Sequence, residues 1–432
     1  MSNLNENGKA GKLNTEARII VNEGVLEISG VEELGYFEFD EEISMSITKI
    51  ILSKELKAIG LGQFRGFTHL KVVEAEGLIS INRNCFADCS KLETVNAPNI
   101  EYIGENAFEG CKLLKNIDLS KVIMLDTGAF KGCSELRSVR LTNLKNIYGA
   151  AFRDCVRLEE AELGAVTQIS YDLFSGCRNL KKIIAKDVIV IGESSFNSCL
   201  SLVDIDMPNA EVIRERAFSG CTALKSVNMS NLRILEDKAF ENCKNLVGFK
   251  APSLLQVKDS CFNSCEKLQT IDAPKLESVG WKTFENCASI EKLELPSVKH
   301  IGDSAFKNCQ KIKICEFNNL VTIDEEAFAN CTILEVFNAI NLETIKANAF
   351  EMTAINVVEF PKLKKLGVSA FEGCVDLITV SLPSLGKVPS RAFTGCINLV
   401  IVVLNSAEKI DVTAFENRSM ITIFKAHKEV KQ

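Results

Sequence analysis

Fourteen of the seventeen cysteines recur in one register, each placed three residues after a phenylalanine. Thiols at a fixed spacing could be metal ligands, disulfide partners or nucleophiles, or they could simply pack. If the units that carry them stack, the column is a line of Cβ atoms about 4.8 Å apart. A disulfide needs about 3.8 Å between Cβ atoms, and a tetrahedral metal site needs four convergent ligands. Because Phe67, Thr353 and Arg418 replace cysteine in other units, we interpret the column as buried packing.

No other group of residues has the spacing of a catalytic site. The three histidines, His69, His300 and His427, lack the cysteine, serine or acid pattern of a triad or metal site. The chain also contains no Walker sequence, G-x-G-x-x-G, H-E-x-x-H or G-x-S-x-G motif. We therefore predict that the protein is not an enzyme and has no cofactor or metal ligands.

The phenylalanines define an internal repeat of 22 residues that covers most of the chain. The spacing is constant from Phe64 to Phe350, and Phe371, Phe393 and Phe415 follow after one step of 21 residues, which gives seventeen units. A fixed period of this size predicts a solenoid, in which each unit buries its apolar face against its neighbours. Each unit contains the segment L-x-x-V-x-[L/A], whose alternation predicts a short strand, often ended by proline. A second apolar pair follows, and then a piece that we expect to be one turn of α- or 3₁₀-helix.

The full unit, I-G-x-x-A-F-x-G-C-x-x-L-x-x-V-x-[L/A]-P, resembles the BspA-like leucine-rich repeats. Two examples are Ile103 to Leu119 and Ile301 to Phe317, and the N-terminal segment Glu23 to Leu34 resembles the family's β-rich cap. The resemblance implies an α/β repeat fold: a right-handed curved solenoid with a parallel sheet on the concave face and short helical turns and loops on the convex face. It also implies adhesion to host or microbial surfaces.

The chain's length and composition are those of an ordinary globular protein. The net charge of -7 over 432 residues argues against a nucleic-acid partner, and no run of eighteen apolar residues predicts a membrane span. The polar start lacks a signal peptide, so we predict a cytosolic or non-classically exported protein, with the cell surface as the family's alternative. The expected parts are a disordered tail (1–18), a β-rich cap with a degenerate repeat (19–58), the solenoid (59–425) and a C-terminal tail (426–432).

The residues seven, eight and ten after each phenylalanine should point outward from the sheet. In the middle of the chain these positions alternate in charge, as in Arg137, Glu159, Lys181 and Asp204, so we expect neighbouring strands to pair their charges. In the C-terminal half they become acidic or apolar, and an exposed apolar patch marks an interface. The predicted partner-binding residues are therefore Asp272, Glu294, Glu316, Glu359, Ile314, Val336, Val357, Ile378, Val400, Ile401, Val403 and Ile423.

The sequence therefore predicts a non-enzymatic scaffold that binds a protein of unidentified nature through the concave sheet, with self-association as a possibility. An alternative is an intracellular structural component that packs permanently against a partner or against itself. A third possibility is a calcium-dependent module that uses the acidic column, although a calcium ion needs convergent oxygen ligands.

Overall fold

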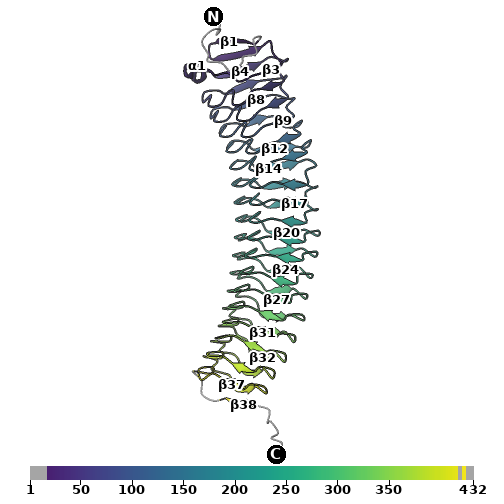
Figure 1. Cartoon of the computed structure of the whole chain (residues 1–432), viewed down its shortest axis with the longest axis vertical. Coiled ribbons are helices and arrows are strands. Elements are labelled where there is room, and N and C mark those ends of the chain that lie inside the picture. The colour runs from purple at the N-terminus through teal and green to yellow at the C-terminus, as the bar shows by residue number, and fades with distance from the viewer. Residues whose placement is uncertain (1–16, 417–420, 425–432) are drawn as a thin grey trace, which may run out of the picture. The chain divides into compact units, whose positions relative to one another are not determined.

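The structure is a computed structural model that describes residues 17–416 and 421–424, apart from the side chains of Lys292 and Glu294. It divides into two compact units, Met1–Ala210 and Glu211–Gln432, which we call unit 1 and unit 2 and describe separately. Each unit is a stack of turns of nearly constant length, and most turns contribute one longer strand of two to four residues and one shorter strand of two residues (Figure 1). The solenoid predicted from the 22-residue period is confirmed.

The described chain begins with an antiparallel pair of strands in the segment predicted to be a cap, and we call this segment the cap. Strands β1 (Arg18–Asn22) and β2 (Val25–Ser29) form an antiparallel hairpin, and β2 then pairs in parallel with β4 (Lys49–Leu52). Between them lie β3 (Glu33–Leu34) and α1 (Glu41–Ser46), the one α-helix among the described residues. The hairpin thus starts the parallel ladder that the repeats continue.

Aromatic packing and one amide fix the cap to the first repeat. Phe39 lies against Phe64 and Phe67, with ring centroids 6.2 and 5.4 Å apart. The buried Gln63 accepts a hydrogen bond from the Phe37 N–H at 3.0 Å, and its amide donates one to the Phe37 carbonyl at 2.8 Å. The side chain of Gln63 therefore satisfies both backbone polar groups of Phe37.

The longer strands of each unit pair in parallel within several successive sheets, at the positions predicted for the L-x-x-V-x-[L/A] segment. In unit 1 they are β6 (Val72–Glu74), β8 (Thr94–Asn96), β10 (Asn116–Ile117), β12 (Ser138–Leu141), β14 (Glu160–Leu163), β16 (Lys182–Ile184) and β18 (Asp204–Asp206). In unit 2 they are β20 (Ser226–Asn228), β22 (Gly248–Lys250), β24 (Thr270–Asp272), β26 (Lys292–Glu294), β28 (Ile314–Glu316), β30 (Val336–Asn338), β32 (Val357–Glu359), β34 (Thr379–Ser381), β36 (Ile401–Val403) and β38 (Thr422–Phe424).

The second apolar pair of each turn forms a two-residue strand, and these strands pair in parallel in a second series of sheets, which we call the ladder of short strands. In unit 1 these are β5 (Ala58–Ile59), β7 (Ser80–Ile81), β9 (Tyr102–Ile103), β11 (Met124–Leu125), β13 (Asn146–Ile147), β15 (Gln168–Ile169) and β17 (Val190–Ile191). In unit 2 they are β19 (Val212–Ile213), β21 (Ile234–Leu235), β23 (Gln256–Val257), β25 (Ser278–Val279), β27 (His300–Ile301), β29 (Thr322–Ile323), β31 (Thr344–Ile345), β33 (Lys365–Leu366), β35 (Lys387–Val388) and β37 (Lys409–Ile410). The sequence indicated the pair but not its strand character.

The segment around each phenylalanine is a hydrogen-bonded turn, and not the short helical piece that the sequence predicted. The residues two before and two after the phenylalanine have positive φ, for example 56° at Asn84 and 62° at Asp88. A right-handed helix cannot continue through such residues. Instead the N–H groups of Asn84, Phe86 and Asp88 donate to carbonyls of the next turn at 2.7 to 2.8 Å. Packing between turns therefore determines the conformation of this segment.

The core is a column of phenylalanines beside a column of cysteines. Within each unit, successive rings of the Phe64–Phe415 column stack with centroids 5.1 to 5.5 Å apart. All seventeen cysteines are buried and free, which confirms the packing interpretation. Phe67 and Thr353, which replace cysteine, are buried as well, whereas Arg418 lies outside the described residues.

The cysteines have a further role that the sequence did not reveal. The Cys89 thiol donates a hydrogen bond to the Phe64 carbonyl of the preceding turn at 3.1 Å, and the Cys309 thiol does the same to Phe284 at 3.2 Å. Burial raises the pKa of the Cys309 thiol, and it raises the pKa of the Cys331 thiol to about 12. The column therefore consists of neutral thiols that join successive turns.

Candidate functional site

The outward side chains of the longer strands form the surface that we call the strand face. Alternation along each strand creates it: in β28, Cys315 is buried while Ile314 is 51% exposed and Glu316 is also exposed. The same alternation repeats from turn to turn because the strands pair in register: Ile314 pairs with Val336, and Val357 pairs with Thr379. The strand face is thus a set of parallel columns with one outward position per turn.

Eleven of the twelve predicted binding residues occupy strand or strand-adjacent positions consistent with this face. Val357, Ile378, Val400 and Ile401 are between 39% and 51% exposed, and Val336 is half-buried. The remaining members are Asp272, Ile314, Glu316, Glu359, Val403 and Glu294, whose side chain is not described. The structure therefore brings the predicted apolar residues together over successive turns of unit 2.

The sequence places Ile423 in the outward column, but its strand pairing puts it in the inward column, where it is still 38% exposed in the last described strand. Ile423 pairs with Val402, which is fully buried, and Thr422 pairs with the exposed Ile401. The final turn has one residue fewer between Phe415 and its strand than the preceding turn has after Phe393. The shift of one residue moves Ile423 to the inward column.

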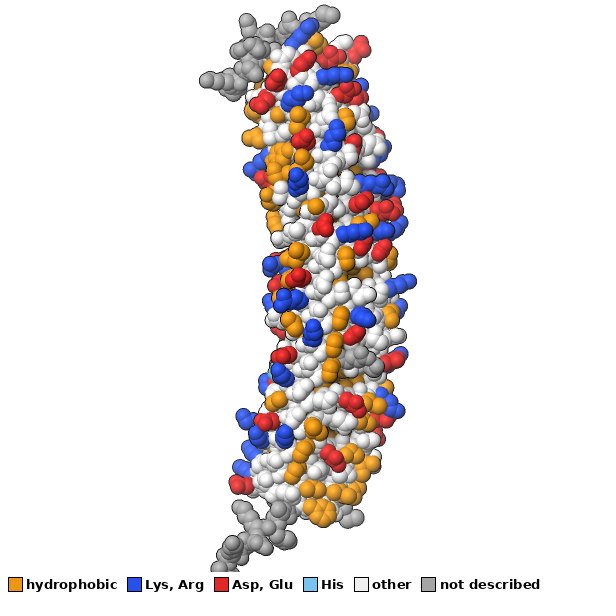
Figure 2. Space-filling model, turned by 90° about the vertical axis from the view of Figure 1, so that its right-hand side faces the viewer, with side chains coloured by type: hydrophobic (Ala, Val, Ile, Leu, Met, Phe, Trp, Pro, Cys, Tyr) orange, Lys and Arg blue, Asp and Glu red, His pale blue; other side chains and the backbone are white. Residues whose placement is uncertain are grey.

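The same shift identifies a residue of the strand face that sequence reasoning missed. Phe424 pairs with Val403 and is 53% exposed. The last turn is one residue shorter than the turn before it, and this difference in length could have been used to predict the outward position of Phe424. Figure 2 shows hydrophobic side chains gathered over this end of unit 2, next to the residues drawn in grey.

The strand face of unit 1 consists mainly of charges that pair across neighbouring strands, as the sequence predicted. Glu159 lies 3.4 Å from Arg137 on one side and 2.8 Å from Lys181 on the other, and Lys182 lies 3.6 Å from Asp204. The hydrogen bond from Lys181 holds the pKa of the Glu159 carboxyl below its usual range. The charged side chains in this part of the strand face therefore pair with one another.

The strand face of unit 2 changes character along its length. Lys250 and Asp272 lie 3.9 Å apart, and Lys313 and Glu335 lie 3.2 Å apart. Among the described side chains, no ion pair is formed by Glu316 or Glu359. Toward β36 the outward positions are predominantly apolar, so this end has neither charge pairing nor cover within the described chain.

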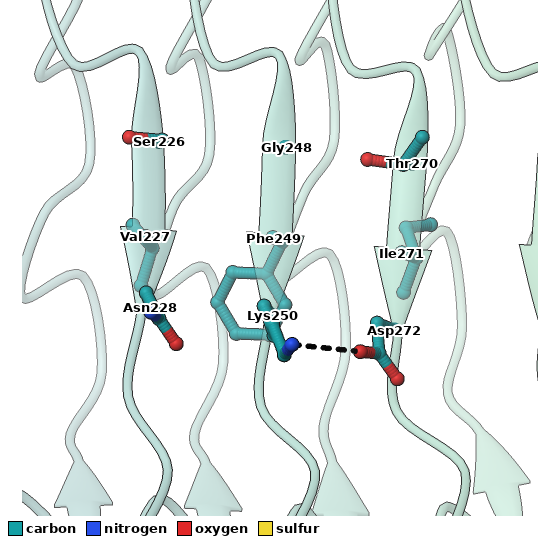
Figure 3. A pocket seen from close by; sticks show the side chains of 9 residues that line it. All are labelled: Ser226, Val227, Asn228, Gly248, Phe249, Lys250, Thr270, Ile271 and Asp272. Carbon is teal, nitrogen blue, oxygen red and sulfur yellow. Dashed lines mark ion pairs between the residues drawn. The ribbon is translucent and has the colours of Figure 1, made fainter.

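A shallow hollow of about 410 Å³ lies over β20, β22 and β24 of unit 2 (Figure 3). It forms because Gly248 occupies an outward strand position without a side chain, between Ser226 and Thr270. The φ of Gly248 is not in the left-handed region, so the backbone does not require glycine there. Lys250 and Asp272 close one side of the hollow, and Phe249 is buried beneath it.

Ionisable groups away from the strand face form pairs and do not form a metal site. His300 Nε2 lies 3.3 Å from Asp324 Oδ2, and Lys346 Nζ lies 2.7 Å from Asp324 Oδ1. Within residues 17–416 and 421–424, no group of three or more histidine, cysteine or acidic side chains is arranged to hold a metal ion. The described part of the chain also contains no helix with the length and apolar character of a membrane span.

These features define a parallel-sheet β-solenoid of leucine-rich-repeat type, with a surface formed by the outward positions of its longer strands. The model of the BspA type leucine rich repeat region matches residues 32–159, 145–269, 233–356 and 322–432. The chain belongs to this family of repeat proteins. The resemblance seen in the sequence is therefore confirmed, and the family is consistent with an interaction scaffold.

One similar solved structure shows the same fold, and two others are similar at lower TM-scores. A leucine-rich repeat protein from Bacteroides ovatus is 24% identical, with a TM-score of 0.64 over 95% of this chain and 98% of that one. A leucine rich cell surface protein from Faecalibacterium prausnitzii is 18% identical over 92% and 94% of the two chains, with a TM-score of 0.35. The pneumococcal vaccine antigen PcpA is 12% identical over 95% and 92%, with a TM-score of 0.36. No curated protein matches this chain.

Proposed function

We propose that this protein is a non-enzymatic scaffold that binds a protein partner through its strand face, with the apolar end of unit 2 as the contact surface. The observation that carries the proposal is the row of outward apolar side chains from Ile314 and Val357 to Ile378, Val400 and Ile401. Soluble proteins rarely leave a contiguous apolar patch of this kind in water. A partner that covers the row would remove these apolar side chains from water.

The polar surroundings of the row indicate what the partner must offer. Protein interfaces commonly have an apolar centre and a polar rim. Glu316 and Glu359 stand beside the row and are exposed, and no described side chain pairs with them. A partner that presents apolar side chains flanked by lysine or arginine would satisfy both parts.

We propose adhesion to host or microbial surfaces as the biological setting, on the basis of the family. An intracellular assembly component remains the second candidate, favoured by the exposure of Phe424 in the last described strand, where another copy of the chain could pack. Surface biotinylation of living cells separates the two. Labelling of the native protein supports adhesion, whereas a protein found only in the cytosol excludes it.

The contact surface is tested by the double variant Val336→Lys with Val357→Lys in an affinity pull-down. Two cations in the row should reduce partner capture by about tenfold or more, because an apolar interface cannot bury unpaired charges. The matched control is Thr94→Lys with Ser138→Lys, which adds the same charges at the same strand position of unit 1. Circular dichroism checks that all variants fold. Equal capture by both double variants would refute the assignment.

A further inference from the structure

Unit 1 carries three tyrosines along its ladder of short strands, away from the strand face. Tyr102 lies in β9, Tyr148 follows β13 by one residue, and Tyr171 follows β15 by two residues. Tyr148 is 47% exposed, Tyr171 is 54% exposed, and Tyr102 is half-buried. We call these three residues the tyrosine surface.

Two rings of the tyrosine surface, those of Tyr171 and Tyr102, contact neighbours that hold them in place. The ring of Tyr171 lies directly over Gly149, where an added Cβ would come within 2.3 Å of the ring carbon Cζ. Gly149 itself is buried, so the ring packs on bare backbone. The Tyr102 hydroxyl donates a hydrogen bond to Asp126 at 3.3 Å. Aromatic rings that are already ordered lose little conformational entropy when they bind a partner.

Carboxylates lie beside Tyr102 and in the turns next to Tyr171, and only some of them have cationic partners. Glu105 lies 3.3 Å from Arg83, and Asp172 lies 3.0 Å from Arg153. Among the described side chains, neither Asp126 nor Glu193 has an ion-pair partner, and Glu193 is exposed. The surroundings of the tyrosine surface therefore retain negative charge.

We propose that the tyrosine surface binds an arginine-rich segment of another protein. A guanidinium group stacks on an aromatic face and is attracted by the electron density of the ring. It can also form paired hydrogen bonds with a carboxylate such as Asp126 or Glu193. An acidic segment would be repelled, and a purely apolar one would leave the carboxylates unmatched. Ordered rings beside carboxylates that have no ion-pair partner among the described side chains thus select a cationic, planar group.

This surface is separate from the contact surface proposed above. It belongs to the short-strand ladder of unit 1, whereas the apolar row belongs to the longer strands of unit 2. The two proposals can therefore succeed or fail independently.

The test uses the full chain and a fluorescein-labelled hexa-arginine peptide, with binding followed by fluorescence anisotropy. Tyr148→Ala with Tyr171→Ala should weaken binding by about fivefold or more. Tyr148→Phe with Tyr171→Phe should retain the affinity within about twofold, because phenylalanine keeps the aromatic face. The matched control is Tyr36→Ala, which removes another tyrosine with 53% exposure, at a hollow also lined by Arg65 and Arg83. It should leave the affinity unchanged.

Three outcomes would overturn the proposal. The first is the absence of binding by the native chain at peptide concentrations up to about 1 mM. The second is equal affinity of the native and double-alanine chains. The third is equal binding of hexa-arginine and hexa-glutamate peptides. A thermal melt of each variant shows whether the fold is kept. If the double-alanine variant is unfolded, the double-phenylalanine variant is compared with Tyr36→Ala. An equal loss of peptide affinity in these two variants would contradict a local aromatic site.

Discussion

The strand faces of unit 1 and unit 2 are built on the same buried columns but present different outward side chains. Beneath both faces, stacked phenylalanines and thiol-to-carbonyl hydrogen bonds join successive turns. Above them, unit 1 pairs its charges across strands, as Glu159 does with Lys181, whereas the end of unit 2 exposes residues such as Ile378 and Val400. The difference shows that the fold does not determine the surface. Function must therefore be sought in the positions that do not repeat.

The largest expected effect concerns the column of buried cysteines, which the two units share. The unfolding free energy should fall as the pH rises above about 9, because thiols in the unfolded chain ionise near pH 8.5. Burial raises the pKa of the folded Cys374 thiol to about 11 and that of the folded Cys331 thiol to about 12. The free energy of unfolding that this pKa difference contributes is present in full below pH 8.5, and it is lost as the pH rises toward the pKa of the folded thiol. Each thiol should contribute a slope of about 1.4 kcal/mol per pH unit.

Urea unfolding at pH 7, 8, 9 and 10, followed by circular dichroism, measures this loss. The decline should begin near pH 9, before most lysines and tyrosines titrate. Since both units contain the cysteine column, we expect both units to unfold and to lose their circular dichroism signal. A midpoint that does not change up to pH 10 would show that the thiols are not buried as neutral groups.

The smaller expected effect concerns the paired face of unit 1. Replacing Lys181 by methionine should raise the pKa of the Glu159 carboxyl toward its usual range, because the main cause of its lowering is removed. The thermal midpoint should change little, since exposed ion pairs contribute little to stability. The contribution of Glu159 exists above its unfolded pKa and is lost as the pH falls through the lower folded pKa.

Carboxyl titration by NMR at low and high salt measures the pKa of Glu159. Val357→Thr in unit 2 serves as the comparison, since it changes an exposed side chain without an ion pair and should leave the titration of Glu159 unaltered. A pKa of Glu159 that is the same with and without Lys181 would mean that the strand face of unit 1 is not paired in solution.

The repeat and its buried columns were predictable from the sequence because they recur at every turn. The positions of Phe130 and Cys133, and of the strand at Ser138–Leu141, follow from the period alone. Local chemistry was less informative in the turns. Arg216 and Glu326 adopt positive φ, although neither side chain favours that conformation. Hydrogen bonds between turns impose it, and a single unit read by itself does not reveal them.

The candidate surface was predictable in kind but not at its end. The alternation of the strands placed Ile314 and Val357 outward, whereas the short final turn moved Ile423 inward and Phe424 outward. The hollow at Gly248 and the ring of Tyr171 over Gly149 depend on contacts between neighbouring turns. Such contacts involve residues 22 positions apart in the chain, and no single motif records them.

Photo-cross-linking in the native host tests the central claim most directly. A benzophenone amino acid is placed at Val357 in the apolar row of unit 2, and at Ser138 on the strand face of unit 1 as the control. If the apolar end of unit 2 is the contact surface, Val357 should yield a discrete cross-linked product, with another protein or with a second copy, and Ser138 should yield none. Cross-linking at Ser138 alone, or at neither position in the folded protein, would contradict the account.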